Sequence, residues 1–192
     1  MSNTNLSSGQ DLDNPMGTKP IWTLLRTYAI PSIISLLVSS IYNFADQLFI
    51  ANIVGIYGNA ATNVAFPLTT LITAFSVLIG LGTAANFNLL IGGKRNDEAA
   101  HFTGNAVILA IILGIVVMAV SLIFLEPMLV LFGATENVLP FALNYTGITA
   151  LGIPFLLFST SMSYIIRADG SPRFSMILIA SGAVLNIGLD AL

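Results

Sequence analysis

The sequence predicts an all-α polytopic membrane protein, because of its low charge, its high mean hydropathy and its long apolar runs. Of the 192 residues, 56% are apolar and only 8% are charged, with a mean hydropathy of +0.91. A soluble domain carries about a quarter charged residues, so most of this surface suits lipid. Apolar runs approaching the roughly 20 residues that cross a bilayer recur along the chain. Because cysteine is absent, a disulfide framework and a thiolate metal site are both excluded.

The first apolar span is predicted at residues 28–50, after a polar stretch at residues 1–18. That stretch is expected to be a disordered cytoplasmic tail, since it lacks the basic start and apolar middle of a secretory signal. The next apolar run is too long for one helix. The turn-like sequence VGIYGNAA at residues 54–61 divides it, which leaves residues 62–91 as the second span.

Three further spans follow. Residues 102–125 form the third, and residues 126–137, with proline, glycine and two acids, are predicted to be a loop with a short interfacial piece. The fourth covers residues 138–166 and is interrupted by glycines and a proline. The fifth covers residues 174–192 and meets the end of the sequence without a polar tail, so we expect the chain to be truncated in this helix.

Three prolines lie inside the predicted spans, at Pro31, Pro67 and Pro154. Proline removes a backbone hydrogen bond and crowds the preceding turn, so we expect each of these residues to kink its helix.

Basic residues predict the orientation of the spans. All of them fall before the first span, between the second and third, or between the fourth and fifth: Lys19, Arg26, Lys94, Arg95, Arg167 and Arg173. The opposite loops carry only Glu126 and Glu136. By the positive-inside tendency, the N-terminus and the basic loops are cytoplasmic, in a multi-pass protein of the plasma membrane.

Two acids lie within apolar spans, Asp46 and Asp190. A carboxylate inside a bilayer costs at least a few kcal/mol, so such a residue usually faces a cavity or a partner. Asp190 lies about 24 Å along the fifth span at 1.5 Å per residue, which places both acids in the outer half of the membrane. We interpret them as a proton- or cation-binding pair. The alternative is that each acid snorkels to the interface or binds a backbone group.

Amide and hydroxyl groups accompany these acids, and those on the acids' own spans lie three or four residues away, on the same helix face. They are Tyr42 and Asn43 in the first span, Tyr145, Thr160 and Ser163 in the fourth, and Asn186 in the fifth. Such oxygens suit a proton network or a hard cation, so Na⁺ at Asp46, Asp190 and Asn186 is one prediction. Serine and threonine in membrane helices also serve simply to pack helices, which is the alternative for Thr160 and Ser163.

The sequence contains no constellation of nucleophile and base, so we predict no enzyme. Four glycines, Gly80, Gly82, Gly92 and Gly93, could suggest a phosphate-binding loop. However, no strand precedes them and no G-K-[ST] sequence follows, so close helix packing explains them better. No cofactor other than a coupling ion is expected.

Four stretches of the sequence resemble one family of transporters. They are FADQLFIA at residues 44–51, GLGT at 80–83 leading to GGKR at 92–95, FGATE at 132–136 leading to Tyr145, and RADGSPR at 167–173 followed by LNIGLD at 185–190. In their order and spacing, residues 19–192 resemble the N-terminal half of multidrug and toxic compound extrusion (MATE) transporters, closest to the bacterial multidrug-export branch.

The resemblance implies an antiporter of twelve helices in two six-helix lobes. Residues 19–192 would then be a partial N-lobe with five helices, whose partners are membrane lipids and the missing C-terminal lobe, with no nucleic acid. Such proteins export cationic or amphipathic drugs in exchange for H⁺ or Na⁺ by alternating access.

The resemblance also implies that residues matching Asp46, Asp190, Asn186 and Tyr145 bind the cation. The family often has an amide where this sequence has Thr160 or Ser163. Two alternatives stay open from the sequence: a lipid or oligosaccharide flippase of similar architecture, and an inactive membrane fragment.

Overall fold

The computed structural model describes residues 20–190, with side chains as far as Gly188. The tail predicted at residues 1–18 lies outside the described residues. Within the described part the chain is almost entirely helical and contains no strand. The five apolar segments occur in the predicted order.

The first two helices are longer than the spans predicted from the sequence. Helix α2 covers Ile21–Ile53 and α3 covers Ile56–Gly92. The turn between them is only Val54 and Gly55, and Gly55 has φ +82°, a conformation that glycine adopts readily. The predicted turn at residues 54–61 is therefore wrong beyond Gly55. Gly58 lets the start of α3 fold tightly against the turn, since a Cβ there would lie 2.6 Å from the Cβ of Val54.

The third apolar segment is α4, Asn96–Ile123, and it begins earlier than predicted. Asp97 and Glu98 occupy its first turn, where the positive end of the helix dipole favours acids. Arg95 hydrogen-bonds to Glu98 and holds this end of the helix. The short helix α5, Leu125–Leu131, occupies part of the segment predicted as a loop with an interfacial piece.

The fourth apolar segment is broken into two helices. Helix α6 covers Leu139–Leu151 and α7 covers Ile153–Ala168, with a bend of 55° between them. Pro154 stands in the first turn of α7, where its missing N–H costs nothing, and it cannot continue the hydrogen bonding of α6. By contrast, α2 continues through Pro31 and α3 continues through Pro67.

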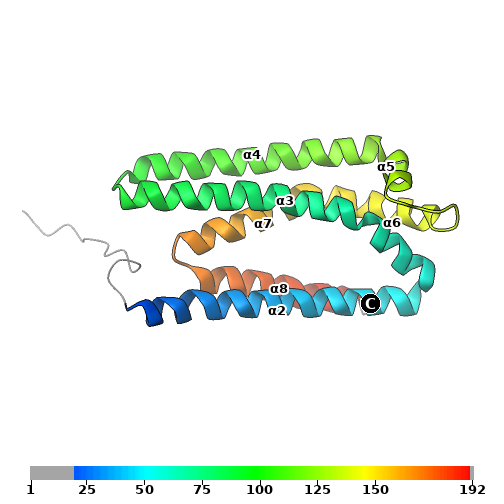
Figure 1. Cartoon of the computed structure of the whole chain (residues 1–192), viewed down its shortest axis with the longest axis horizontal. Coiled ribbons are helices and arrows are strands. Elements are labelled where there is room, and N and C mark those ends of the chain that lie inside the picture. The colour runs from blue at the N-terminus through cyan, green and yellow to red at the C-terminus, as the bar shows by residue number, and fades with distance from the viewer. Residues whose placement is uncertain (1–19, 191–192) are drawn as a thin grey trace, which may run out of the picture.

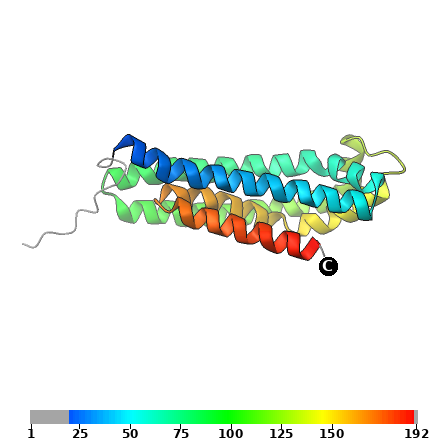
Figure 2. The same ribbon diagram turned by 90° about the horizontal axis from the view of Figure 1, so that it is seen from below.

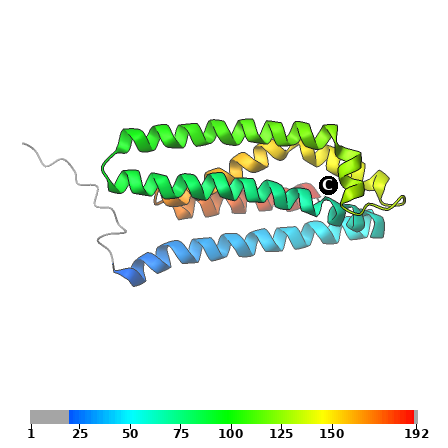
Figure 3. The ribbon, with the colours of Figure 1, turned by 45° about the horizontal axis from the view of Figure 1, so that its top comes forward.

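The last helix, α8, covers Pro172–Asp190 and runs beside α2 (Figure 1). Helices α2 and α8 form one layer, while α3, α4, α6 and α7 pack together in a second. Seen from below, α2 and α8 run in the same direction (Figure 2). The turned view shows α3 diverging from α2 after the turn that joins them (Figure 3).

The core lies within the second layer. Buried apolar residues of α3, α4, α6 and α7 meet there, including Ile72, Ala110 and Leu157. Two glycines allow close approach of the helices. A Cβ on Gly114 of α4 would lie 2.7 Å from the Cα of Pro154, and a Cβ on Gly80 of α3 would lie 3.0 Å from the carbonyl oxygen of Ser161.

Lengths and composition of the helices fit a membrane. Helices α2, α3 and α4 are each long and apolar enough to cross it, and α6 with α7 makes a bent fourth span. Helix α8 is also apolar, but over Pro172–Gly188 it is shorter than these spans. Large apolar side chains are exposed along every long helix, as expected of a surface that contacts lipid or further helices.

Candidate functional site

The acid predicted in the first span, Asp46, lies near the C-terminal end of α2. Asp46 is half-buried, and so are Tyr42, one turn earlier on α2, and Tyr145 on α6. The Tyr145 hydroxyl is close enough to interact electrostatically with both Asp46 and Tyr42. The structure therefore brings together three of the predicted residues, from the first and fourth apolar segments.

A side-chain hydrogen bond joins α3 to α2 next to this acid. The Thr62 hydroxyl lies 3.2 Å from Oε1 of Gln47 and 2.9 Å from the carbonyl oxygen of Asn59. Thr62 is buried, with 8% of its surface exposed. Sequence reasoning missed both Gln47 and Thr62. Gln47 could have been found from the sequence, because it is an amide in an apolar run directly after Asp46.

Two buried oxygens near this end have no hydrogen-bond partner among the described residues. They are Oδ1 of Asn59 on α3 and Oγ1 of Thr146 on α6, which follows Tyr145. Buried polar atoms normally have a partner, because an unpaired one costs about 1–3 kcal/mol. Sequence reasoning missed these residues too, and both add oxygen acceptors at the end of the molecule that carries Asp46.

Helix α8 places its two predicted residues at a matching depth. The loop before α8 lies against the start of α2, since a Cβ on Gly170 would be 3.7 Å from the Tyr28 hydroxyl. Because the two helices run in parallel at 1.5 Å per residue, Asn186 and the backbone of Asp190 fall at about the level of Asp46. Asn186 is half-buried, whereas the side chain of Asp190 lies outside the described residues.

The other predicted residues lie elsewhere. Ser161 donates a hydrogen bond to the carbonyl oxygen of Ser76, about 21 Å further along α3 than Thr62 at 1.5 Å per residue. Thr160 and Ser163 flank that contact, so they are far from Asp46 along the helix axis. The amide of Asn43 is exposed and donates to the carbonyl oxygen of Ser39 on its own helix.

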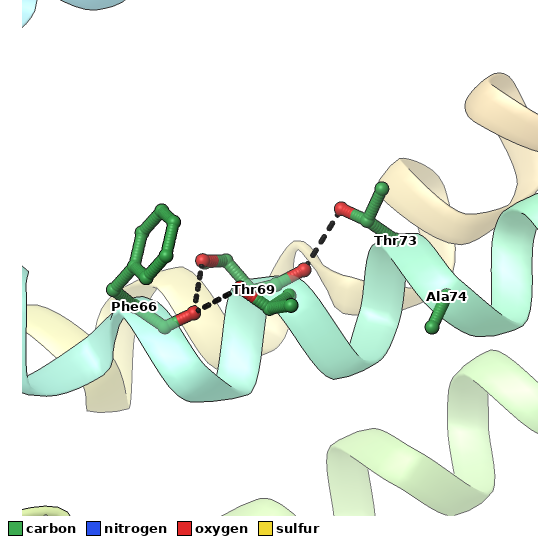
Figure 4. Close-up of a pocket in the computed structure, with 5 residues that line it drawn as sticks. Phe66, Thr69, Thr73 and Ala74 are labelled. Atoms are coloured by element: carbon green, nitrogen blue, oxygen red, sulfur yellow. Dashed lines mark hydrogen bonds between the residues drawn. The ribbon is translucent and has the colours of Figure 1, made fainter.

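A hollow of about 400 Å³ lies on the exposed side of α3 (Figure 4). It is lined by Phe66, Thr69, Thr70, Thr73 and Ala74. The three threonine hydroxyls donate to carbonyl oxygens of α3 itself, so they offer only acceptor oxygens to a ligand. Since one helix supplies all of these residues, a second wall would have to come from another segment or partner.

The oxygen groups around Asp46 are of the kind that bind hard cations. A carboxylate, a phenol hydroxyl and amide oxygens suit H⁺ or Na⁺ better than a transition metal. Among the residues that the structure describes, no group of three or more His, Cys, Asp or Glu side chains could hold a metal ion.

Known proteins resemble this chain in sequence and in fold. The FAD transporter of Shewanella oneidensis is 30% identical over 90% of this chain, and the multidrug export protein MepA of Staphylococcus aureus is 26% identical over 89%. The solved structure of the MATE multidrug transporter DinF-BH, determined as a ligand complex, is 35% identical, covers 91% of this chain and has a TM-score of 0.85.

The chain spans only part of these proteins, covering 38% of the length of both curated relatives and 39% of DinF-BH. Its helical architecture matches theirs, so it forms part of a multi-pass membrane protein. The family model for MatE matches residues 31–192, which is most of the chain. By both sequence and fold, the chain belongs to the MatE family of transporters.

Proposed function

We propose that the intact protein is a secondary active antiporter that exports cationic or amphipathic drugs in exchange for H⁺ or Na⁺. The observation that carries this proposal is the placement of Asp46. It is a half-buried acid in an apolar helix, within electrostatic reach of Tyr145. An acid in that setting is energetically costly, and such residues mark ion pathways and proton relays.

Coupling follows from the cost of the buried charge. When Asp46 is ionised, its charge requires polar or cationic partners between the helices. Binding of H⁺ or Na⁺ neutralises the carboxylate and weakens its need for polar partners. The balance between outward-open and inward-open forms then shifts, with Pro31 as the place where α2 bends.

Asn186 and Asp190 complete the proposed cation site from α8. Both fall at about the level of Asp46, and α8 packs along α2. Tyr42 supplies a second hydroxyl from α2. Thr160 and Ser163 lie too far along α7 to ligate the same ion, and we propose instead that they line the route of the substrate. The remaining helices of the intact protein would provide the opposite wall of that route.

A second candidate substrate comes from one of the relatives. The FAD transporter of Shewanella oneidensis is 30% identical to this chain, which favours a flavin nucleotide as an alternative to a cationic drug. An anionic nucleotide needs basic partners. Among the described residues, basic side chains lie only near the ends of the helices, so such partners would come from another part of the intact protein.

The test is efflux of ethidium, a fluorescent organic cation, from cells that express the intact protein. Wild type is compared with Asp46→Asn and Asp190→Asn, at matched expression, under a proton-only or a sodium-only gradient. Glu136→Gln is the control, because this exposed acid lies in a loop.

We expect both span variants to lose at least tenfold in the rate of ethidium efflux and the control to keep it. Normal ethidium efflux by Asp46→Asn would contradict the proposal. Efflux of FAD in place of ethidium would select the second candidate.

A further inference from the structure

The structure contains a second pocket, at the end opposite to Asp46. It is an open hollow of about 380 Å³, in which Ala100 and Asp169 are exposed. It is lined by Phe87 of α3, Ala100 and Thr103 of α4, Ile165 and Ile166 of α7, and Asp169 just after α7. Asp169 lies about 27 Å from Asp46 along the α2 axis, judged from the contact between Gly170 and Tyr28. The two sites are therefore separate.

The shape of this pocket follows from small side chains at the place where three helices meet. The core closes at Ile165, which is 6% exposed, and at Ala106 of α4. Beyond that level α4 presents Ala100 and Thr103, which are too small to fill the space between α3 and α7. The walls are consequently apolar, with Phe87 as the aromatic side chain.

Among the described residues, the only charged side chain that lines the pocket is that of Asp169. It directly follows α7, and the C-terminal end of a helix carries a partial negative charge of its own. The carboxylate is exposed, so a cation can reach it from outside the protein. The nearest arginine in sequence, Arg167, is engaged elsewhere, because its Nε donates to Oγ of Ser175, 3.1 Å away, and its guanidinium lies 6.0 Å from the centre of the Tyr164 ring.

We infer that this pocket binds an organic ammonium ion that carries an apolar group. The ammonium would pair with Asp169 and the apolar part would lie against Ile165, Ile166 and Phe87, whose ring face attracts organic cations. The Thr103 hydroxyl donates to the carbonyl oxygen of Ala99, so its lone pairs are free to accept from the ammonium. Two sources have this chemistry, a dissolved amine and the headgroup of an aminophospholipid.

The test is direct binding of 1-adamantylamine, a compact apolar ammonium, to the intact protein in nanodiscs of phosphatidylglycerol. Calorimetry would compare wild type with Asp169→Asn, which removes the charge, and Ala100→Phe, which fills the space. Asp97→Asn is the matched control, an exposed acid of α4 that does not line the pocket. Neutral 1-adamantanol is the control ligand.

We expect Asp169→Asn to weaken binding at least tenfold, Ala100→Phe to abolish it, and 1-adamantanol to bind at least tenfold more weakly than the amine. Asp97→Asn should bind as wild type does. Unchanged binding by Asp169→Asn or Ala100→Phe, or an equal loss in Asp97→Asn, would overturn the inference.

Adding phosphatidylethanolamine to the nanodiscs separates the two sources. If the lipid headgroup is the occupant, the apparent affinity of wild type for 1-adamantylamine falls as the share of this lipid rises. If a dissolved amine is the occupant, the affinity stays constant. Both results are consistent with an ammonium site, and each identifies one of the two sources as the natural ligand.

Discussion

At the scale of single residues, the packing of the second layer depends on glycine. Gly114 brings α4 against the backbone of Pro154, at the point where α7 begins. Any side chain at this position meets backbone atoms, which cannot move aside as a flexible side chain can. Gly82 on α3 is a natural comparison, because a Cβ there would have no heavy atom within 4 Å.

The first prediction concerns these two glycines. Gly114→Leu should lower the melting temperature of the purified intact protein, because overpacking of a close helix contact costs about 1–3 kcal/mol. Gly82→Leu should leave the melting temperature nearly unchanged. Equal melting temperatures for the two variants would show that α4 and α7 are not in the contact described above.

Sequence reasoning found individual residues where the chemistry alone was distinctive. A charged residue stands out in an apolar helix, so Asp46 could be selected without a structure. Tyr145 was selected as a polar residue of an apolar span and again by the family resemblance, but its nearness to Asp46 depends on how α6 packs. Gln47 and Thr62 were missed because their contact depends on the register between α2 and α3, which no local pattern encodes.

At the scale of elements, apolar length predicted the five apolar segments but not their ends. The turn after α2 is shorter than predicted, because Gly55 reverses the chain within two residues and Gly58 allows α3 to start at once. The break between α6 and α7 lies at Gly152 and Pro154, where the sequence predicted an interruption. Pro31 and Pro67 carry the same local signal, yet α2 and α3 continue through them, since neighbouring helices can support a helix around a proline.

The second prediction concerns the orientation of the helices, which rests on the distribution of basic residues. We expect the loop between α7 and α8 to be cytoplasmic and the loop between α5 and α6 to be outside. In intact cells, a membrane-impermeant maleimide should label Asn137→Cys but not Ser171→Cys, each in a cysteine-free background. After the cells are opened, both should be labelled. Labelling of Ser171→Cys alone in intact cells would reverse the assigned topology.

At the scale of the whole molecule, two layers of helices meet near Asp46. Helices α2 and α8 form one layer and α6 belongs to the other (Figure 1). Asp46 of the first layer is near enough to Tyr145 of the second to interact electrostatically. A charge placed between layers can bias how they sit relative to each other. The sequence predicted that Asp46 and Asp190 form a pair, which implies that α2 lies near α8, but the division of the helices into two layers required the structure.

The central claim is that Asp46 couples substrate movement to the ion, and transport by proteoliposomes of the intact protein tests it most directly. Exchange of labelled for unlabelled ethidium without a gradient needs only substrate binding and alternation, whereas net transport under a proton or sodium gradient also needs coupling. We predict that Asp46→Asn keeps exchange within about threefold of wild type while its gradient-driven transport falls at least tenfold. Gradient-driven transport at the wild-type rate in Asp46→Asn would contradict the account.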